Sequence, residues 1–426
     1  MAMIKNPITV IQKGGDIVNG IIEEYKSSSG TIDADTFVEF VKKVGEDTRL
    51  TDYSLYTVST NTSTVRLDDD RVFVVFARTS KEVYGVVCTI SGSTITAGNP
   101  VLLFGEAYSG GSPSAVLLAN DKVFVSGCSA TGVECAVCTI SNTTITVGST
   151  KTIAVVGVTP VTSAVGIGAE KVFVIYTFGG AIRGVICTIS GTDVTVGNYK
   201  QIVGVTPCQV SMVFDESGER VFMAYSRDSD YCPYAVVCTI SNTTFTPGTA
   251  KQIASTESMT DVVTTTMVEA NKVLVTHMIG TYAYGIVCTM SGRTISLGAD
   301  TKLPVRAFNS FAVPLDTNRI LFIHGASAGS YALNAATCTV SGTTITTGND
   351  TQLSAALDSS ESASAVLLSG GRVFIAHNNG ESGNLYGIVL RPEIDEQTIK
   401  PSETRIDGLT KTECKDTTAG KVWVLN

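Results

Sequence analysis

A repeated segment of about 50 residues runs through most of this chain, and it restricts the possible folds more than any other feature. The repeat is clearest around the pattern Cys-Thr-x-Ser, which recurs at Cys88, Cys138, Cys187, Cys238, Cys288 and Cys338. A seventh copy, YGIVLRPEIDEQTI, has Leu390 at the cysteine position. A constant period of this length is typical of arrays built from one supersecondary unit.

Each copy contains several short apolar segments that favour β-strands. In one copy they are SAVLLAN (114–120), KVFVSG (122–127) and CAVCTIS (135–141), and a fourth segment follows at 144–153. They are rich in Val, Ile, Phe and Thr and are bounded by Gly, Asn, Asp or Ser. Ser-Gly or Ser-Asn before Thr-Ile-Thr indicates a tight hairpin. Each copy therefore predicts four antiparallel strands, called A, B, C and D in chain order.

Strands B and C are apolar almost without interruption, as in VFVVF at 72–76. Such strands must be covered on both faces. An open stack of sheets would do this but would leave two uncapped ends, whereas a closed ring leaves none. We therefore predict an all-β, seven-bladed β-propeller of four-stranded antiparallel blades. The paired glycines of Kelch blades and the Trp-Asp pair of WD blades are absent, and Trp423 is the only tryptophan.

Three regions are expected. Residues 1–50 form a small α+β segment, residues 51–406 form the propeller, and residues 407–426 form a C-terminal β tail. The outer strand that closes the ring comes either from 54–58 or from the tail, and the sequence leaves both open.

The N-terminal segment predicts one strand and one helix. Residues 4–11 favour a strand that Pro7 interrupts, and residues 35–44 favour a short amphipathic helix. Phe37 and Phe40 lie on the apolar face of this helix.

Composition excludes several classes of protein. The net charge is −9 and no Lys/Arg run stands out, which disfavours nucleic acid and anionic lipid as partners. The longest apolar runs are far shorter than the ~20 residues that span a bilayer. The N-terminus shows no secretory signal, so synthesis in a bacterial cytoplasm is expected. Cysteines that occur once per repeat lie too far apart to pair, and we predict that they are small buried side chains in a reducing compartment.

The loops predict two different faces. The A–B and C–D turns share one face of a propeller and are uniform here, and we call this the uniform face. The B–C and D–A loops share the other, the variable face, and differ between copies: compare RTSKEV (78–83), SRDSDYCPY (226–234) and NNGESGNLY (378–386). Because individual loops on a rigid scaffold usually carry binding, the variable face is the predicted recognition surface.

The only three histidines, His277, His324 and His377, occupy the same position at the end of strand B. A shared zinc ion is disfavoured, because equivalent sites in neighbouring blades lie about 8–10 Å apart, whereas zinc ligands converge to ~2.1 Å from the metal. Two interpretations remain: half-buried rings that close each blade, or a rim of Tyr and His rings that binds a sugar. No metal, cofactor or catalytic residue is predicted. The predicted ligand-binding residues are Tyr176, Tyr225, Tyr231, His277, His324, Tyr331, His377 and Tyr386.

The sequence lacks the motifs of several enzyme families. There is no Ser-x-Asp-x-Gly-x-Thr-Trp box of sialidases, no Gly-x-Ser-x-Gly elbow and no supported carboxylate pair. We therefore expect a chain that is not an enzyme. The alternatives are a glycan-cleaving propeller and a purely structural scaffold.

Two end segments carry a resemblance. The start, MAMIKNPITVIQKGG, and the ending, GLTKTECKDTTAGKVWVL, resemble segments of tail and baseplate-associated proteins from phages and prophages of Gram-positive bacteria. The resemblance covers a small part of the chain. It implies a virion protein that attaches to other virion or tail proteins through residues 1–50, while the propeller binds a glycan or protein of the host cell surface. A homo-oligomer is compatible with this role.

Overall fold

The computed structural model describes residues 45–54, 62–78, 82–105, 113–119, 121–129, 132–155, 161–254, 263–326, 332–354, 363–379 and 384–391, with short strands at 10–11, 17–18, 25–26, 37–40 and 397–398. The chain divides into two compact units. One unit is Val44–Leu390, and the other combines Met1–Lys43 with Arg391–Asn426.

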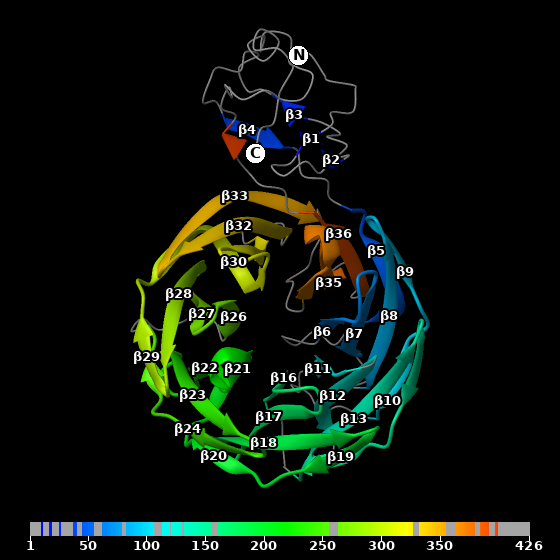
Figure 1. The fold of residues 1–426 in the computed structure, drawn as a ribbon, viewed down its shortest axis with the longest axis vertical. Helices are drawn as coiled ribbons and strands as arrows, with labels where there is room; N and C mark the ends of the chain where they lie inside the picture. Colours follow the sequence, from blue (N-terminus) through cyan, green and yellow to red (C-terminus); the bar gives the residue numbers. More distant parts are fainter. Residues whose placement is uncertain are drawn as a thin grey trace. The chain divides into compact units, whose positions relative to one another are not determined.

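Residues 44–390 form a ring of seven four-stranded antiparallel blades, so the predicted seven-bladed β-propeller is confirmed (Figure 1). The innermost A strands are β6 (Thr62–Arg66), β11 (Ser114–Leu117), β16 (Thr162–Gly166), β21 (Pro207–Asp215), β26 (Val263–Glu269), the second half of β30 (Thr301–Pro314) and β34 (Ala363–Leu367). The B strands are β7 (Arg71–Ala77), β12 (Lys122–Ser129), β17 (Lys171–Phe178), β22 (Arg220–Arg227), β27 (Lys272–Ile279), β31 (Arg319–Ala326) and β35 (Val373–Asn379).

The C strands are β8 (Val83–Ser91), β13 (Gly132–Ser141), β18 (Ala181–Ser190), β23 (Pro233–Ser241), β28 (Tyr282–Ser291), β32 (Leu333–Ser341) and β36 (Asn384–Leu390). The outer D strands are β9 (Thr94–Ala97) with β10 (Val101–Phe104), β14 (Thr144–Val147) with β15 (Lys151–Ala154), β19 (Asp193–Val196) with β20 (Lys200–Val203), β24 (Thr244–Pro247) with β25 (Lys251–Gln252), β29 (Thr294–Leu297) with the start of β30, β33 (Thr344–Ser354) and β5 (Thr48–Ser54). Two A–B turns contain a single 3-10 turn each, η1 (Glu216–Gly218) and η2 (Ser369–Gly371).

The C–D turns are the tight hairpins that the sequence predicts. The residue after the serine of the Cys-Thr-x-Ser pattern adopts a positive φ in six blades. It is always Gly or Asn: Gly92, Asn142, Gly191, Asn242, Gly292 and Gly342. Glycine and asparagine adopt this backbone conformation at little cost, which explains the restricted choice. Each C–D hairpin is also tied to the A–B turn of its own blade, as where Ile90 N donates to Asp70 O at 2.7 Å. The two kinds of turn therefore share one face, as expected.

The hydrophobic core is divided into seven clusters, one between each pair of neighbouring blades. In blade 1, for example, Val74 packs toward blade 7, whereas Phe73 and Val75 pack toward blade 2. All three side chains are fully buried. The continuous apolar character of strands B and C thus follows from burial on both faces.

The inner edges of the A strands are closed by hydroxyl groups from the preceding blade. Ala115 N donates to Ser63 Oγ at 3.1 Å, Ala164 N donates to Ser114 Oγ at 3.1 Å, and Thr265 N donates to Ser211 Oγ at 3.0 Å. The three serines hold the same register position opposite strand B. Backbone N–H groups of an edge strand need such partners, and here the neighbouring blade supplies them.

The ring closes through the N-terminal part of the chain. β5 pairs with β36 in the seventh blade, and Gly45 N donates to Val389 O at 3.0 Å. Of the two strands that the sequence left open, the N-terminal one closes the ring, and it lies at 48–54 rather than 54–58. The C-terminal tail, 407–426, is outside the described residues.

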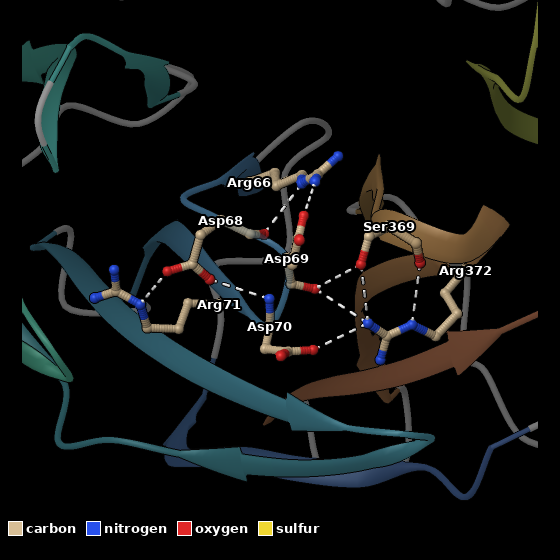
Figure 2. A network of polar contacts seen from close by, with 7 residues as sticks. All are labelled: Arg66, Asp68, Asp69, Asp70, Arg71, Ser369 and Arg372. Carbon is tan, nitrogen blue, oxygen red and sulfur yellow. Dashed lines mark hydrogen bonds and ion pairs between the residues drawn. The ribbon is translucent and has the colours of Figure 1, made fainter.

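A polar network on the uniform face adds to this closure (Figure 2). Arg372 of the seventh blade donates to Asp70 Oδ1 at 3.0 Å, to Asp69 O at 3.1 Å and to Gly92 O at 3.0 Å, all in the first blade. Arg71 continues the pattern from the first blade to the second, since it pairs with Asp121 at 3.0 Å. A basic residue at the start of strand B therefore links successive blades.

The terminal unit contains short strands, and one prediction for it is wrong. β1 (Val10–Ile11) pairs with β2 (Ile17–Val18), and β4 (Phe37–Phe40) pairs with both β3 (Tyr25–Lys26) and β37 (Gln397–Thr398). Residues 37–40 are thus a strand and not part of the predicted helix 35–44. Phe-Val-Glu-Phe is a short run of residues that favour strands, and periodicity alone does not separate helix from strand over so few positions.

The observed division of the chain also lies at other residues than expected. β5 begins at Thr48, within the expected N-terminal segment 1–50, yet it belongs to the propeller. Residues 391–406 were expected in the propeller, and they group with the terminal unit. No helix in the described part of the chain is long and apolar enough to cross a membrane.

The cysteines that recur once per blade are buried, as predicted, in the part of the chain that the structure describes. Burial raises the pKa of the Cys88 thiol to about 12, so it stays a neutral apolar side chain. Cys135 and Cys138 lie in different inter-blade clusters, on opposite faces of β13.

Leu50 provides a test of ring closure. Its side chain is 3% exposed and packs in the cluster between the seventh and first blades. We expect Leu50→Ala to lower the free energy of unfolding by about 2–5 kcal/mol, because it removes buried methyl groups and leaves a cavity. Leu102→Ala is the matched control, since Leu102 is 45% exposed on an outer strand, and its change should stay within about 0.5 kcal/mol. Urea unfolding of both variants measures the difference, and equal stabilities would contradict closure through β5.

Candidate functional site

The residues predicted at the end of strand B lie inside the blades. Tyr176 and Tyr225 are each 2% exposed, His324 is 1% exposed, and His277 and His377 are fully buried. These five rings therefore do not form an open rim on the variable face. The structure matches the interpretation in which they close each blade from within. Contact between them and a ligand stays a prediction, and it would require that the blade ends move.

Each histidine is held by an aspartate of its own blade. The Nε2 atoms of His277, His324 and His377 lie 3.0, 3.0 and 2.9 Å from a carboxylate oxygen of Asp300, Asp350 and Asp47, respectively. An ionised carboxylate only accepts hydrogen bonds, so Nε2 donates in each pair. The three rings thus point to three separate partners and do not converge on one point. No group of three or more metal-ligating side chains occurs among the residues with described positions.

The partner aspartates share a sequence pattern that the predictions did not include. All three stand in the pattern Gly-x-Asp-Thr-x-Leu, at 45–50, 298–303 and 348–353. In the four blades without histidine, the equivalent residues are Pro100, Thr150, Tyr199 and Ala250. Histidine and aspartate therefore occur together or not at all. The copy at 45–50 precedes the first blade, and its match to the histidine of the last blade would have identified the closing strand.

The His324–Asp350 pair of the sixth blade shows how the hydrogen bond affects the charge of the carboxylate. Burial acts to raise the pKa of Asp350, but hydrogen bonds from His324 and from Asn334 Nδ2 outweigh it and hold that pKa below its ordinary value. The carboxylate is therefore ionised in the folded protein at neutral pH. His324 is buried, whereas the Asp350 side chain is 31% exposed, so the pair ties a buried ring to the outer edge of its blade.

Tyrosines of strand C stack on three of these buried rings. Tyr284 stacks on His277 at a centroid distance of 5.8 Å, and Tyr386 stacks on His377 at 6.2 Å. Tyr234 stacks on Tyr225 at 5.7 Å. Tyr386, one of the predicted ligand-binding residues, is half-buried in this stack. Tyr331 lies outside the described residues.

The exposed aromatic rings gather in blades 3 and 4. Among residues whose exposure is described, the exposed large aromatic side chains are Phe178 at 39%, Tyr199 at 62% and Tyr231 at 47%. Only Tyr231 was predicted from the sequence. Phe178 was missed because it ends β17, which is otherwise largely buried, and Tyr199 was missed because it takes the position that aspartate occupies in blades 5 to 7. For Tyr199, the replacement of aspartate by tyrosine at this position was a sequence signal of an exposed ring.

Arg183 organises the exposed rings of blade 3. Its guanidinium carbon lies 4.7 Å from the ring centre of Phe178 and 5.0 Å from that of Tyr199. Such cation–π contacts hold both rings and the guanidinium in a defined arrangement. Burial raises the pKa of the Tyr176 hydroxyl, which also lies beside Arg183. We call Tyr176, Phe178, Arg183 and Tyr199 the blade 3 cluster.

Asp230 organises the neighbouring loop of blade 4. It accepts hydrogen bonds from Arg227 Nε at 3.0 Å, from Cys232 N at 3.2 Å and from the Tyr234 hydroxyl at 3.0 Å. The hydrogen bond from Arg227 is the main reason that the pKa of Asp230 is lowered. This network holds the loop that exposes Tyr231, whose φ is 52°.

The two loops are connected. Asp228 N of the blade 4 loop donates to Thr206 O at 3.0 Å, and Thr206 belongs to the D–A loop that follows blade 3. The position of a side chain at Gly180, in the blade 3 hairpin, would be 3.8 Å from Thr206 Oγ1. Blades 3 and 4 thus present a continuous, ordered part of the variable face that carries all three exposed aromatic rings of the described region.

Known proteins are similar to this chain in fold alone. No protein-family model matches the sequence, and no curated protein matches it. A fungal alcohol oxidase in complex with copper is 13% identical with a TM-score of 0.54, and the match covers 83% of this chain and 76% of that one. A protein of unknown function from Dyadobacter fermentans is 12% identical with a TM-score of 0.52, covering 83% and 99% of the two chains. A proposed 6-phosphogluconolactonase from Bacteroides fragilis is 9% identical with a TM-score of 0.53, covering 70% and 86%.

These similarities overturn the prediction that the chain is not an enzyme. That prediction rested on the absence of motifs of a few enzyme families, and the same fold is found in an alcohol oxidase and in a proposed lactonase. Missing motifs therefore do not separate binding propellers from catalytic ones. At 9–13% identity the similarity shows the fold and assigns no activity.

The His324–Asp350 pair provides a test of the blade-closing role. We expect Asp350→Ala to lower the free energy of unfolding at pH 7 by about 1–3 kcal/mol, because it leaves the buried Nε2 donor without its acceptor. The pKa of Asp350 is lowered in the folded state, so its ionised form stabilises the fold above about pH 4, and this contribution is lost as the pH falls through the lowered pKa. The difference between wild type and variant should therefore shrink in strong acid.

Asp52→Ala is the control for this test. The Asp52 side chain is 85% exposed and pairs with Arg49, and such a surface pair contributes about 0–1 kcal/mol. Urea unfolding at pH 7 and pH 3 measures all three proteins. A difference between wild type and Asp350→Ala that is the same at both pH values would refute the stabilising role of the ionised carboxylate.

Proposed function

We propose that this propeller binds carbohydrate on its variable face, at the surface that blades 3 and 4 form together. The observation that carries the proposal is the gathering there of Phe178, Tyr199 and Tyr231, the exposed aromatic rings of the described region. Sugars present flat C–H faces beside hydroxyl groups, and an aromatic ring with a polar tip complements both. The other large exposed apolar side chains, Leu102, Leu117 and Val155, are aliphatic.

The arrangement of the rings supports binding. Arg183 holds Phe178 and Tyr199, and the network of Asp230 holds the loop of Tyr231. Side chains that are already fixed lose little conformational freedom when a ligand binds, so more of the contact energy becomes affinity. These rings also stand on loops of a rigid scaffold, which is a frequent position for binding residues.

We further propose that the carbohydrate belongs to a bacterial surface and that the protein is part of a phage virion or a related appendage. The resemblance of the two end segments to phage tail and baseplate-associated proteins supports this role. In that role, the unit formed by residues 1–43 and 391–426 attaches to other virion proteins, and the propeller carries the binding surface.

A glycan array with the full chain tests the binding function. We expect a defined set of bacterial surface glycans to bind, and Tyr231→Ala to weaken that binding by about 5-fold, since stacking on one aromatic ring contributes of the order of 1 kcal/mol. Leu102→Ala is the control, because Leu102 is similarly exposed on blade 1, and its binding should equal that of wild type. Release of soluble sugar from each bound glycan is measured in parallel, because enzymes share this fold. Failure to bind any glycan or host envelope fraction would refute the proposal.

The virion role has its own test. Phage particles produced by a strain that carries this gene are purified and probed with an antibody against the propeller. We expect the chain in the particle fraction, and we expect a chain that lacks residues 1–43 to remain in the supernatant. Detection of the full chain only outside particles would contradict the role, whatever the glycan array shows.

A further inference from the structure

We propose that the blade 3 cluster binds a carboxylate, so that the preferred ligand is an acidic saccharide containing uronic or sialic acid. This inference rests on the proposed carbohydrate-binding function and names the class of carbohydrate. The group that would bind the carboxylate is the guanidinium of Arg183.

Arg183 differs from the comparable arginines of the same face. Arg78, in the B–C loop of blade 1, pairs with Glu82 at 3.4 Å and stacks on Tyr53 at 4.5 Å. Arg227, the last residue of β22 in blade 4, pairs with Asp230 and stacks on Tyr234 at 4.3 Å. Arg183 stacks on two rings, and within the described region no carboxylate forms an ion pair with it. The Tyr176 hydroxyl accepts a hydrogen bond from its guanidinium, but no described carboxylate neutralises its positive charge.

The contacts of Arg183 leave it suited to this task. Cation–π stacking engages the faces of a planar guanidinium, whereas hydrogen bonds to a carboxylate use its edge. A guanidinium presents two parallel N–H donors along that edge, which match the two oxygens of a carboxylate. Stacking on Phe178 and Tyr199 also holds the group in place before a ligand arrives. The same rings are the surface on which a sugar ring would stack.

The hairpin beside Arg183 leaves room for a ligand. Its tip is Gly179-Gly180, and both residues have a positive φ, of 60° and 71°. A side chain at Gly179 would begin 3.9 Å from Arg183 Nη2, and apart from the adjacent residues no other described atom lies within 4 Å of that point. Glycine therefore leaves this nitrogen uncovered on the side of the hairpin tip. A residue with a side chain would be strained there and would cover the donor.

Because the whole chain is negatively charged, binding of an acidic ligand depends on the local contacts of Arg183. With a net charge of −9 the protein repels acidic polymers at long range, so an acidic ligand is held only if specific contacts outweigh that repulsion. Charge-assisted hydrogen bonds from Arg183 meet this requirement. We therefore expect selectivity for a carboxylate in a defined position on the sugar ring rather than for negative charge in general.

The test compares matched saccharides on the full chain by calorimetry. The probes are tetragalacturonate, its methyl ester, sialyllactose, lactose and a sulfated galactose oligomer. We expect at least one of the carboxylates to bind about 10- to 100-fold more tightly than its neutral counterpart, since a hydrogen bond to a charged group contributes this much. Arg183→Gln should remove the preference, and Arg183→Lys should keep part of it. Arg293→Gln, in a C–D turn of the uniform face, should leave it unchanged.

The outcomes separate this inference from the proposed function. Binding of the neutral saccharides without preference for the carboxylates overturns the inference and leaves the carbohydrate-binding function standing. A preference for the sulfated oligomer, or a carboxylate preference that Arg183→Gln retains, also overturns it. Absence of binding to these probes and to the whole glycan array refutes the proposed function as well. The comparison of acid with ester uses the wild-type chain, so it decides the matter even if a variant fails to fold.

Discussion

Burial of strands B and C between neighbouring blades is the interaction on which this structure depends. Each blade has two apolar faces, and each face is covered only by the next blade, so no blade forms a complete core alone. A ring of seven such blades gives seven equivalent clusters and leaves no end uncovered. Polar contacts also join neighbouring blades. Serine hydroxyls do so at the inner edge, and basic residues do so on the uniform face.

Much of this architecture was predictable because it repeats. The same apolar strands recur in seven copies, so a wrong strand assignment in one copy is revealed by comparison with the others. The tight C–D hairpins followed from glycine or asparagine at one position. Prediction failed where a segment occurs once. Residues 37–40 gave four positions from which to choose between helix and strand, and the choice of helix was wrong.

The candidate site was harder to predict, because burial depends on the neighbouring blade. His277, His324 and His377 were recognised as equivalent, but their aspartate partners lie at the outer edge of the same blades, 23, 26 and 330 residues away. Comparing only the ends of strand B concealed that partnership. Phe178, Arg183 and Tyr199 come from three separate strands or loops of blade 3, and no single motif contains them. Their joint exposure appears only once the blade is assembled.

The closing strand has a consequence for the order of assembly. β5 is synthesised before every other strand of the ring, yet its partner β36 follows more than 300 residues later, as the separation of Asp47 from His377 shows. During translation the first six blades can stack one after another, while the seventh waits for both ends of the chain to meet. Until β36 is made, β5 has no partner in the seventh blade and blade 1 has one uncovered face, so we expect ring closure to be the last step of assembly.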